Sequence, residues 1–292
     1  MMKKRYIGFK TMVHIVFAIL TVSFLLPFLI VLSVSISNEA QITDYGFSII
    51  PKIIDFTAYK MIFSDFSSFG RSLCFTVFVA VLSPILACIV QALIAYALAQ
   101  DDFEWRTPIN WYLILTMFFS AGTIPTYVIY TKVYHLGNNP LIYFVGLAGA
   151  WSIILYRTFF KEIPPSLIES ARIDGASELQ TIWYIVVPMA KAIFAMQYVL
   201  GMIGQWNNYG TSLMYISDEK WMTVQHVMQR ALENVNLLRQ SYAMLGASMK
   251  TEVPVMTMRY AMLVVSLIPI FIVFPYAQRY FSKGMTVGSV KG

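Results

Sequence analysis

Long apolar stretches alternate with short polar stretches along the whole of this 292-residue chain. A helix needs about 20 residues, at about 1.5 Å per residue, to cross the hydrocarbon core of a bilayer. Six stretches reach that length, and they cover residues 12–35, 72–99, 108–131, 141–160, 183–205 and 257–280. The pattern predicts an all-α, polytopic membrane protein with six transmembrane helices in a single domain over residues 1–292.

Composition supports a membrane location. Hydrophobic residues make up 58% of the chain and charged residues only 12%. Charged residues reach about a quarter in ordinary soluble domains, so the composition excludes that class. The formal net charge of +6 is dispersed along the loops. We therefore expect membrane lipid, and no nucleic acid, as the surrounding partner.

Lys and Arg residues that flank the apolar stretches predict which side each loop faces, because short cytoplasmic flanks carry an excess of them. These residues precede the first stretch, surround the segment 161–182 and follow the last stretch; they are Lys3, Lys4, Arg5, Lys10, Arg157, Lys161, Arg172, Lys191, Arg279, Lys283 and Lys291. The short loop 132–140 contains only Lys132. Both termini and segment 161–182 are predicted to be cytoplasmic, and the loop 206–256 external.

Two further patterns concern the outer side. Tyr127, Tyr130 and Tyr143 fall near predicted outer ends, as expected for an aromatic belt at headgroup depth. Within the outer loop, apolar residues recur at helical spacing between 224 and 238. This amphipathic helix either packs on the outer ends of the bundle or docks an external partner.

The most informative segment is a polar island at residues 169–180, between two stretches that are apolar enough to span. Pro165 suits the first turn of a short helix over 166–172. Gly175 then permits the left-handed backbone that ends a helix. Ser177, with a glutamine three residues later, fits the capping box of a second helix. The pattern predicts two short helices at a fixed angle, continuous with the fifth span.

The sequence Glu169-Ser-Ala-Arg-Ile-Asp-Gly-Ala176, followed by an apolar run that ends in Pro188, resembles the cytoplasmic coupling loop of ABC importer permeases, in its carbohydrate-importing branch. An interfacial helix without a partner is the alternative. The resemblance implies that residues 165–182 couple to ATPase subunits, with Glu169, Ala171, Arg172, Asp174, Gly175 and Ser177 in the coupling segment. Ser170 departs from the family signature, which has a second alanine there.

Other segments are similar to the same family. Gly122–Tyr127 resembles a motif of its oligosaccharide and polysaccharide sub-branch. The tail over 278–292 is similar to that of maltose-type permeases, which implies ATPase contacts by Lys283 and Lys291; positive-inside anchoring is the other interpretation. The resemblance implies a multi-pass protein of the bacterial inner membrane. Its implied partners are a related second permease in a heterodimer, two ATPase subunits and an extracellular or periplasmic sugar-binding protein.

The source of energy is predicted to lie in another polypeptide. The six stretches contain no Asp or Glu, which ion-coupled carriers usually need within the membrane. Gly284–Gly288 fails the spacing of a phosphate-binding loop. The resemblance therefore implies that ATP and Mg²⁺ are bound by the partner ATPases, with no cofactor in this chain.

No catalytic or metal-binding group is predicted either. His14, His135 and His226 lie far apart in the sequence, so a shared metal or nucleophile site is not expected. Three alternatives stay open. They are a secondary carrier or channel, a membrane scaffold or sensor that does not transport, and an importer permease for a peptide or amino-acid cargo.

A sugar path needs hydrogen-bonding side chains and flat aromatic faces inside an apolar bundle. Such residues gather at the outer end of the fifth stretch; they are Gln197, Gln205, Trp206, Asn207, Asn208 and Tyr209. Trp206 and Tyr209 also fit an aromatic belt. Gln197 and Gln205 also fit hydrogen bonds between helices.

Overall fold

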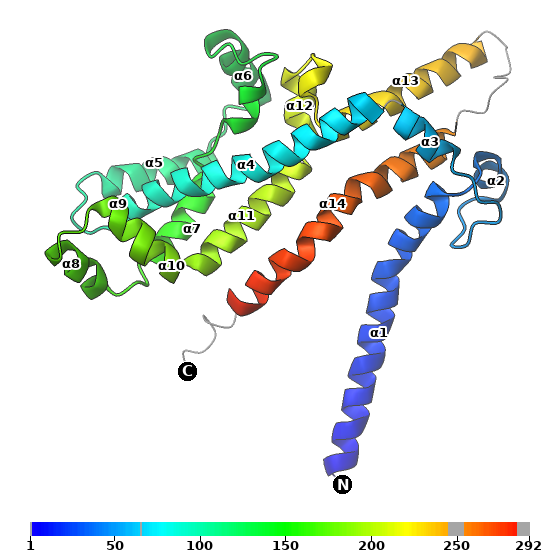
Figure 1. The fold of residues 1–292 in the computed structure, drawn as a ribbon. Helices are drawn as coiled ribbons and strands as arrows, with labels where there is room; N and C mark the ends of the chain where they lie inside the picture. The colour runs from blue at the N-terminus through cyan, green and yellow to red at the C-terminus, as the bar shows by residue number, and fades with distance from the viewer. Residues whose placement is uncertain (1, 65, 245–253, 285–292) are drawn as a thin grey trace. The chain divides into compact units, whose positions relative to one another are not determined.

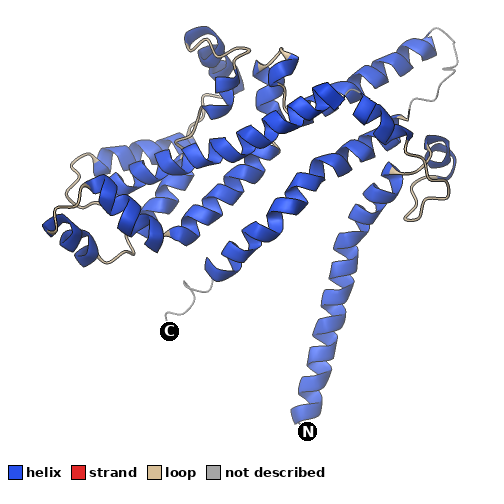
Figure 2. Ribbon diagram, in the orientation of Figure 1, coloured by secondary structure: helices blue, strands red, loops and turns tan. Residues whose placement is uncertain are grey.

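The computed structural model describes residues 2–64, 66–244 and 254–284. Over these residues the regular structure is helical, apart from one isolated antiparallel bridge between Ser37 and Ile54 (Figures 1 and 2). The predicted all-α class is confirmed. The chain divides into two compact units, one of Met1–Phe69 with Val227–Pro269 and the other of Gly70–His226 with Ile270–Gly292.

Three long helices agree with predicted spans. They are α1 (Met2–Ser35), α4 (Phe66–Ala99) and α14 (Val255–Gly284). Each contains a stretch that is long and apolar enough to cross a membrane, over Lys10–Ser35, Phe69–Ala99 and Val255–Ile272 respectively. The predicted amphipathic helix is also present, as α13 (Val224–Met244).

The remaining elements are shorter. They are α2 (Glu39–Tyr45), α3 (Thr57–Ser64), α5 (Arg106–Phe118), α6 (Thr123–Val128), η1 (Ile129–Val133), η2 (Pro140–Phe144), α7 (Ala150–Phe160), α8 (Pro165–Ile173), α9 (Glu178–Thr181), η3 (Ile182–Val186), α10 (Val187–Met189), α11 (Lys191–Trp206), α12 (Tyr209–Tyr215) and η4 (Glu219–Trp221). The segments η1 and η3 are π-helical, whereas η2 and η4 are 3₁₀ helices.

The prediction of one continuous helix over 108–131 is wrong. Helix α5 ends at Phe118, and the α6–η1 segment continues at an angle of 114°. Phe119 has an extended backbone and Gly122 a φ of +82°, so neither residue continues the helix. Apolar content alone did not reveal this break, because both sides of it are hydrophobic.

The predicted helix over 183–205 is bent as well. The segment Glu178–Met189 meets α11 at 85°, and Ala190 at the junction has ψ 16°, outside the helical range. Pro188 lies just before this bend and has no N–H to donate to the preceding turn. The bend therefore falls two residues after Pro188, which ends the apolar run downstream of the polar island.

The prediction of a continuous spanning helix over 141–160 is also wrong. The 3₁₀ helix η2 is followed by non-helical backbone, with φ +72° at Gly146, and α7 has only 11 residues. Eleven residues give about 16 Å of helix, half of a bilayer core. The described residues contain three helices of spanning length, or up to five spans if each bent pair counts as one. The count of six spans therefore stays a prediction.

In the first unit, polar side chains fix the ends of helices. The Glu39 carboxylate accepts hydrogen bonds from the backbone N–H groups of Met256 and Thr257, each at 2.9 Å, at the start of α14. Asp55 accepts from the N–H of Thr57 at 2.9 Å and so caps α3. The Thr57 hydroxyl and amide bonds hold the pKa of Asp55 below its usual value.

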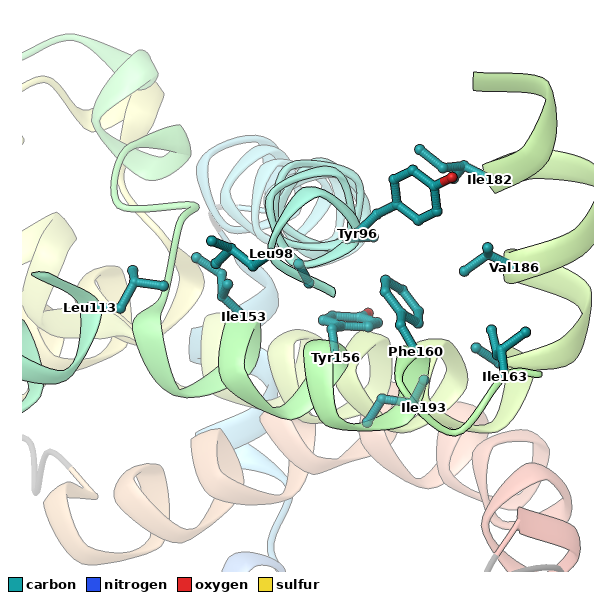
Figure 3. Close-up of a cluster of buried hydrophobic side chains, with 13 residues drawn as sticks. Tyr96, Leu98, Leu113, Ile153, Tyr156, Phe160, Ile163, Ile182, Val186 and Ile193 are labelled. Atoms are coloured by element: carbon teal, nitrogen blue, oxygen red, sulfur yellow. The ribbon is translucent and has the colours of Figure 1, made fainter. Parts of the chain in front are cut away.

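The second unit contains a hydrophobic core centred on α7 (Figure 3). Ile153, Tyr156 and Phe160 follow one face of this helix at helical spacing, and all three are buried. They pack with side chains of α4, α5, η3 and α11, namely Tyr96, Leu98, Leu113, Ile182, Val186 and Ile193. Burial of one such side chain contributes about 1.5–3 kcal/mol. The core thus joins the end of α4 to the helices on both sides of the polar island.

Candidate functional site

The polar island forms two short helices joined by a tight turn, and we call residues 165–182 the coupling segment. The sequence predicted a short helix over 166–172, and helix α8 covers Pro165–Ile173. Gly175 has φ +81°. The N–H of Ala176 donates to the carbonyl of Ala171 at 2.9 Å, which closes the helix end in a Schellman-type turn. Gly175 therefore has the structural role that was expected.

Helix α9 begins with the predicted capping box. The N–H of Gln180 donates to Ser177 Oγ at 3.4 Å, and the N–H of Ser177 donates to Gln180 Oε1 at 2.8 Å. Two backbone donors at the helix start are thereby satisfied. The chain then runs through η3 and α10 toward α11 without a loop. The orientation of α9 is consequently set at both of its ends.

The side chain of Arg172 ties the coupling segment to the end of α4. Its Nε donates to Glu178 Oε1 at 3.1 Å, and its Nη1 lies 3.3 Å from Asp102 Oδ2. Its Nη2 lies 3.5 Å from Gln100 Oε1. The hydroxyl of Tyr96, on α4, donates to Glu178 Oε2 at 2.5 Å. We call these five residues the brace.

The electrostatics of the brace favour the charged form of Arg172. Partial burial disfavours the guanidinium charge, but the Glu178 and Asp102 carboxylates outweigh that cost and raise the pKa of Arg172 above its usual value. The Arg172 side chain is about a third exposed, so the ion pairs contribute modestly. Arg172 and Glu178 lie within the predicted coupling segment, whereas their contacts with Tyr96, Gln100 and Asp102 were not predicted. Asp102 and Arg172 are 70 positions apart, which leaves no local pattern to read.

Other residues of the coupling segment remain available to a partner. Ala171 is buried, whereas Glu169 and Asp174 are exposed. Two apolar side chains next to them are also exposed, Ile173 at 86% and Leu179 at 59%. Exposed apolar side chains beside charged ones are typical of docking surfaces. The segment thus combines a fixed backbone with an open face.

A second candidate site is a cavity of about 430 Å³ in the same unit, which we call the outer cavity because its lining segments were predicted to lie toward the outer side. Its wall includes Gly122, Thr123 and Thr126, which come from the segment that resembles an oligosaccharide-permease motif. It also includes Gln205 and Asn208, which were predicted for the substrate path. The structure therefore brings together two segments that are separated by about eighty positions in the sequence.

The other residues predicted for the substrate path do not line this cavity. Trp206 is buried, and the side chain of Asn207, just after the end of α11, donates to the carbonyl of Ile203 at 2.9 Å. Tyr209 is 44% exposed. Gln197 is buried, and its Nε2 has no hydrogen-bond partner among the described residues. Of the two tail residues, Lys283 lies in the last turn of α14 and Lys291 lies outside the described residues.

Tyrosine rings line the cavity, and the sequence did not assign them to the site. Tyr130, Tyr143 and Tyr215 belong to its wall. The ring of Tyr215 stacks on Tyr127 with centroids 5.5 Å apart and meets Tyr130 edge-on at 5.9 Å. Tyr130 and Tyr143 were interpreted as aromatic-belt residues. Their position in the sequence is compatible with both roles, and the fold shows that they also line this cavity.

The described residues contain no group of three or more His, Cys, Asp or Glu side chains that could hold a metal ion. The available chemistry is hydrogen bonding and aromatic contact in the outer cavity, and charge and apolar contact at the coupling segment.

Comparison with known proteins defines the class of this chain. The family of binding-protein-dependent transport system inner membrane components matches residues 8–287, so the chain belongs to that family. It is therefore a multi-pass subunit of a bacterial inner-membrane transport system.

Two relatives and one solved structure are similar to this chain over more than 90% of its length. The chain is 33% identical to Protein LplC of Bacillus subtilis, over 92% of this chain and 90% of that protein. It is 30% identical to the polygalacturonan/rhamnogalacturonan transport system permease protein YtcP of the same organism, over 91% and 92% of the two chains. A solved bacterial ABC transporter that imports the acidic polysaccharide alginate contains a chain that is 30% identical, with a TM-score of 0.80 and coverage of 94% and 96%.

Proposed function

We propose that this chain is the permease subunit of an ATP-driven importer for an oligosaccharide. The observation that carries the proposal is the coupling segment, a rigid two-helix turn with an open face that is braced to α4. Relatives named for polygalacturonan/rhamnogalacturonan transport and for alginate import support a carbohydrate cargo. A peptide or amino-acid cargo has no such support.

The proposal includes partners. Two ATPase subunits would bind ATP and Mg²⁺, and this chain would have no catalytic role of its own. A related second permease would form the other half of the pathway, and an external sugar-binding protein would deliver the cargo. The exposed Ile173, Leu179 and Glu169 supply the surface that an ATPase subunit would contact. Lys283 and Lys291 remain proposed contacts of the tail.

The geometry indicates how force would enter the bundle. The Schellman-type turn and the capping box fix the angle between α8 and α9. A displacement of α8 therefore moves α9 and the continuous η3–α10 segment with it. The brace carries the same displacement to the end of α4, because Arg172 and Glu178 contact Asp102 and Tyr96. The end of α4 and the η3–α10 segment, which both pack on α7, would thus move together.

Transport by the reconstituted complex tests this proposal. The permease would be placed in proteoliposomes with its ATPases, its second permease and its binding protein, and uptake of labelled oligosaccharide would be followed. We expect uptake only with ATP inside, and no loss when the proton and sodium gradients are clamped at zero. Uptake that persists without ATP and follows an ion gradient would establish a secondary carrier instead. ATP hydrolysis without any uptake would support the scaffold or sensor alternative.

A further inference from the structure

The wall of the outer cavity is held in place by bonds that are remote in sequence. The N–H of Asn138 donates to the carbonyl of Tyr215 at 2.7 Å, and Asn138 Oδ1 accepts from the N–H of Asp218 at 2.8 Å. The Tyr143 hydroxyl donates to the carbonyl of Trp221 at 2.8 Å. Asn138 has φ +56°, a backbone conformation that asparagine tolerates better than most residues. The cavity is therefore built by the fold and is not a gap between loosely placed loops.

Some polar groups of this wall are already used within it. Thr126 Oγ1 donates to the carbonyl of Gly122 at 2.7 Å, and Thr211 Oγ1 donates to Asn208 Oδ1 at 3.1 Å. By contrast, the side chains of Gln205, Thr123 and Tyr130 make no hydrogen bond to another residue that the structure describes. These amide and hydroxyl groups are available to a ligand.

The chemistry of the wall favours an uncharged ligand. None of the lining residues is an Asp, Glu, Lys, Arg or His. A carboxylate placed here would find no cationic partner among the lining residues, whereas a neutral hydroxyl needs none. Partial burial, with the neighbouring hydroxyls of Tyr130 and Tyr127, raises the pKa of Tyr215, so its phenol stays neutral at physiological pH. Neutral hydroxyl, amide and aromatic groups together match the hydroxyls and apolar faces of a sugar ring.

We propose that the outer cavity is a sugar-binding subsite that receives the uncharged, hydroxyl-bearing face of a saccharide, with Gln205 as hydrogen-bonding group and Tyr215 as ring platform. This inference rests on the proposed function and adds the chemical class that the site accepts. A sugar unit that presents a carboxylate to this wall is disfavoured.

The test uses two trisaccharides that differ in the carboxylate, namely neutral α-1,4-galactotriose and α-1,4-trigalacturonate. Thr126→Cys places a thiol in the cavity wall, and Thr131→Cys is its matched control. Both threonines donate to the carbonyl four residues earlier at 2.7 Å, but Thr131 does not line the cavity. Each variant would be made in a Cys74→Ser background, since Cys74 is exposed, and assembled into the full complex.

Protection from a maleimide reports binding without any need for transport. At a galactotriose concentration that occupies most of the sites, we expect labelling of Thr126→Cys to slow at least about fivefold. Labelling of Thr131→Cys should stay unchanged. Trigalacturonate should protect neither. Adding Gln205→Leu to Thr126→Cys should raise the sugar concentration needed for half-maximal protection about tenfold, because one side-chain hydrogen bond is lost. Basal ATP hydrolysis of each variant complex would verify that it is folded.

The outcomes separate the two proposals. No protection at Thr126→Cys in a complex that takes up oligosaccharide would overturn the subsite and leave the permease function intact. Equal protection by both trisaccharides, or equal protection at both thiols, would also overturn the subsite. Protection by galactotriose alone in a complex that never imports sugar would support the subsite and contradict the proposed function.

Discussion

In the coupling segment, the hydrogen bonds that shape the backbone join residues no more than five positions apart, as between Ala176 and Ala171. The walls of the outer cavity are joined by bonds that span more than seventy positions, such as Asn138 to Tyr215 and Tyr143 to Trp221. The first region is built locally and offers an open face, whereas the second is a hollow whose wall is assembled from several elements of the fold. A lever that must transmit force needs local rigidity, and a binding space needs groups from several elements.

The brace adds long-range contacts to the locally built coupling segment, because it attaches this segment to α4 through residues that are distant in sequence. Separate substitutions can therefore distinguish the effects of losing the local turn, the docking face, the brace and a helix cap.

The largest effect is expected from Gly175→Pro. Proline cannot adopt φ +81°, so the turn between α8 and α9 must change. We expect uptake to fall at least about 100-fold while ATP hydrolysis continues, measured on complexes with equal amounts of inserted permease. Gly175→Asn is the matched control, since asparagine tolerates positive φ, and it should retain most of the uptake. Coupled transport by the proline variant at the normal rate would contradict the role of the turn.

A smaller effect is expected at the open face. Ile173 is 86% exposed and would be buried against an ATPase subunit. Ile173→Ser should weaken association of the ATPase by about tenfold or more, because burial of an isoleucine side chain contributes about 1.5–3 kcal/mol. Binding of purified ATPase to the permease in nanodiscs measures this change. Trp151→Ser, which removes a 66%-exposed side chain outside the coupling segment, should leave the affinity unchanged.

The brace should show an intermediate coupling energy. In a double-mutant cycle with Arg172→Gln and Glu178→Gln, the measured quantity is the ratio of sugar imported to ATP hydrolysed. We expect these ratios to give an interaction free energy of about 1 kcal/mol between the two side chains. The pair of Arg106 and Asp101, whose carboxylate is 89% exposed against 55% for Glu178, serves as the control and should give a value near zero. Equal values for the two cycles would remove the brace from the coupling mechanism.

The smallest effects concern helix caps, and they compare the two regions directly. Ser177 caps α9 and Asn208 caps α12, where its Oδ1 accepts from the N–H of Thr211 at 3.2 Å. Ser177→Ala and Asn208→Ala should each cost about 1 kcal/mol of local stability. Hydrogen exchange should accelerate about fivefold near the substituted cap, and only Asn208→Ala should change sugar protection in the outer cavity. Changes in both regions from either substitution would contradict their independent construction.

How much of the structure could be predicted from the sequence depended on how far apart the interacting residues are along the chain. The capping box at Ser177, the left-handed Gly175 and the start of α8 at Pro165 were all predicted and are all present. The breaks at Phe119 and Ala190 were missed, because apolar residues on both sides of each break kept the stretch hydrophobic. Hydrophobicity reports how deep a residue lies, and it does not report whether the helix is continuous.

The sequence by itself determined the membrane class, the all-α fold and the two-helix form of the coupling segment, because apolar length, capping residues and glycine conformation act within a few neighbouring positions. Only the tertiary structure decided that Arg172 meets Glu178 and Asp102, and that Gln205 shares a cavity with Thr123 and Tyr215. Those contacts join residues from different elements. The brace lies where these elements pack around α7, and the cavity wall is held by the bonds from Asn138 to Tyr215 and from Tyr143 to Trp221. Local patterns specify elements, whereas the bends and packing of those elements decide which side chains meet.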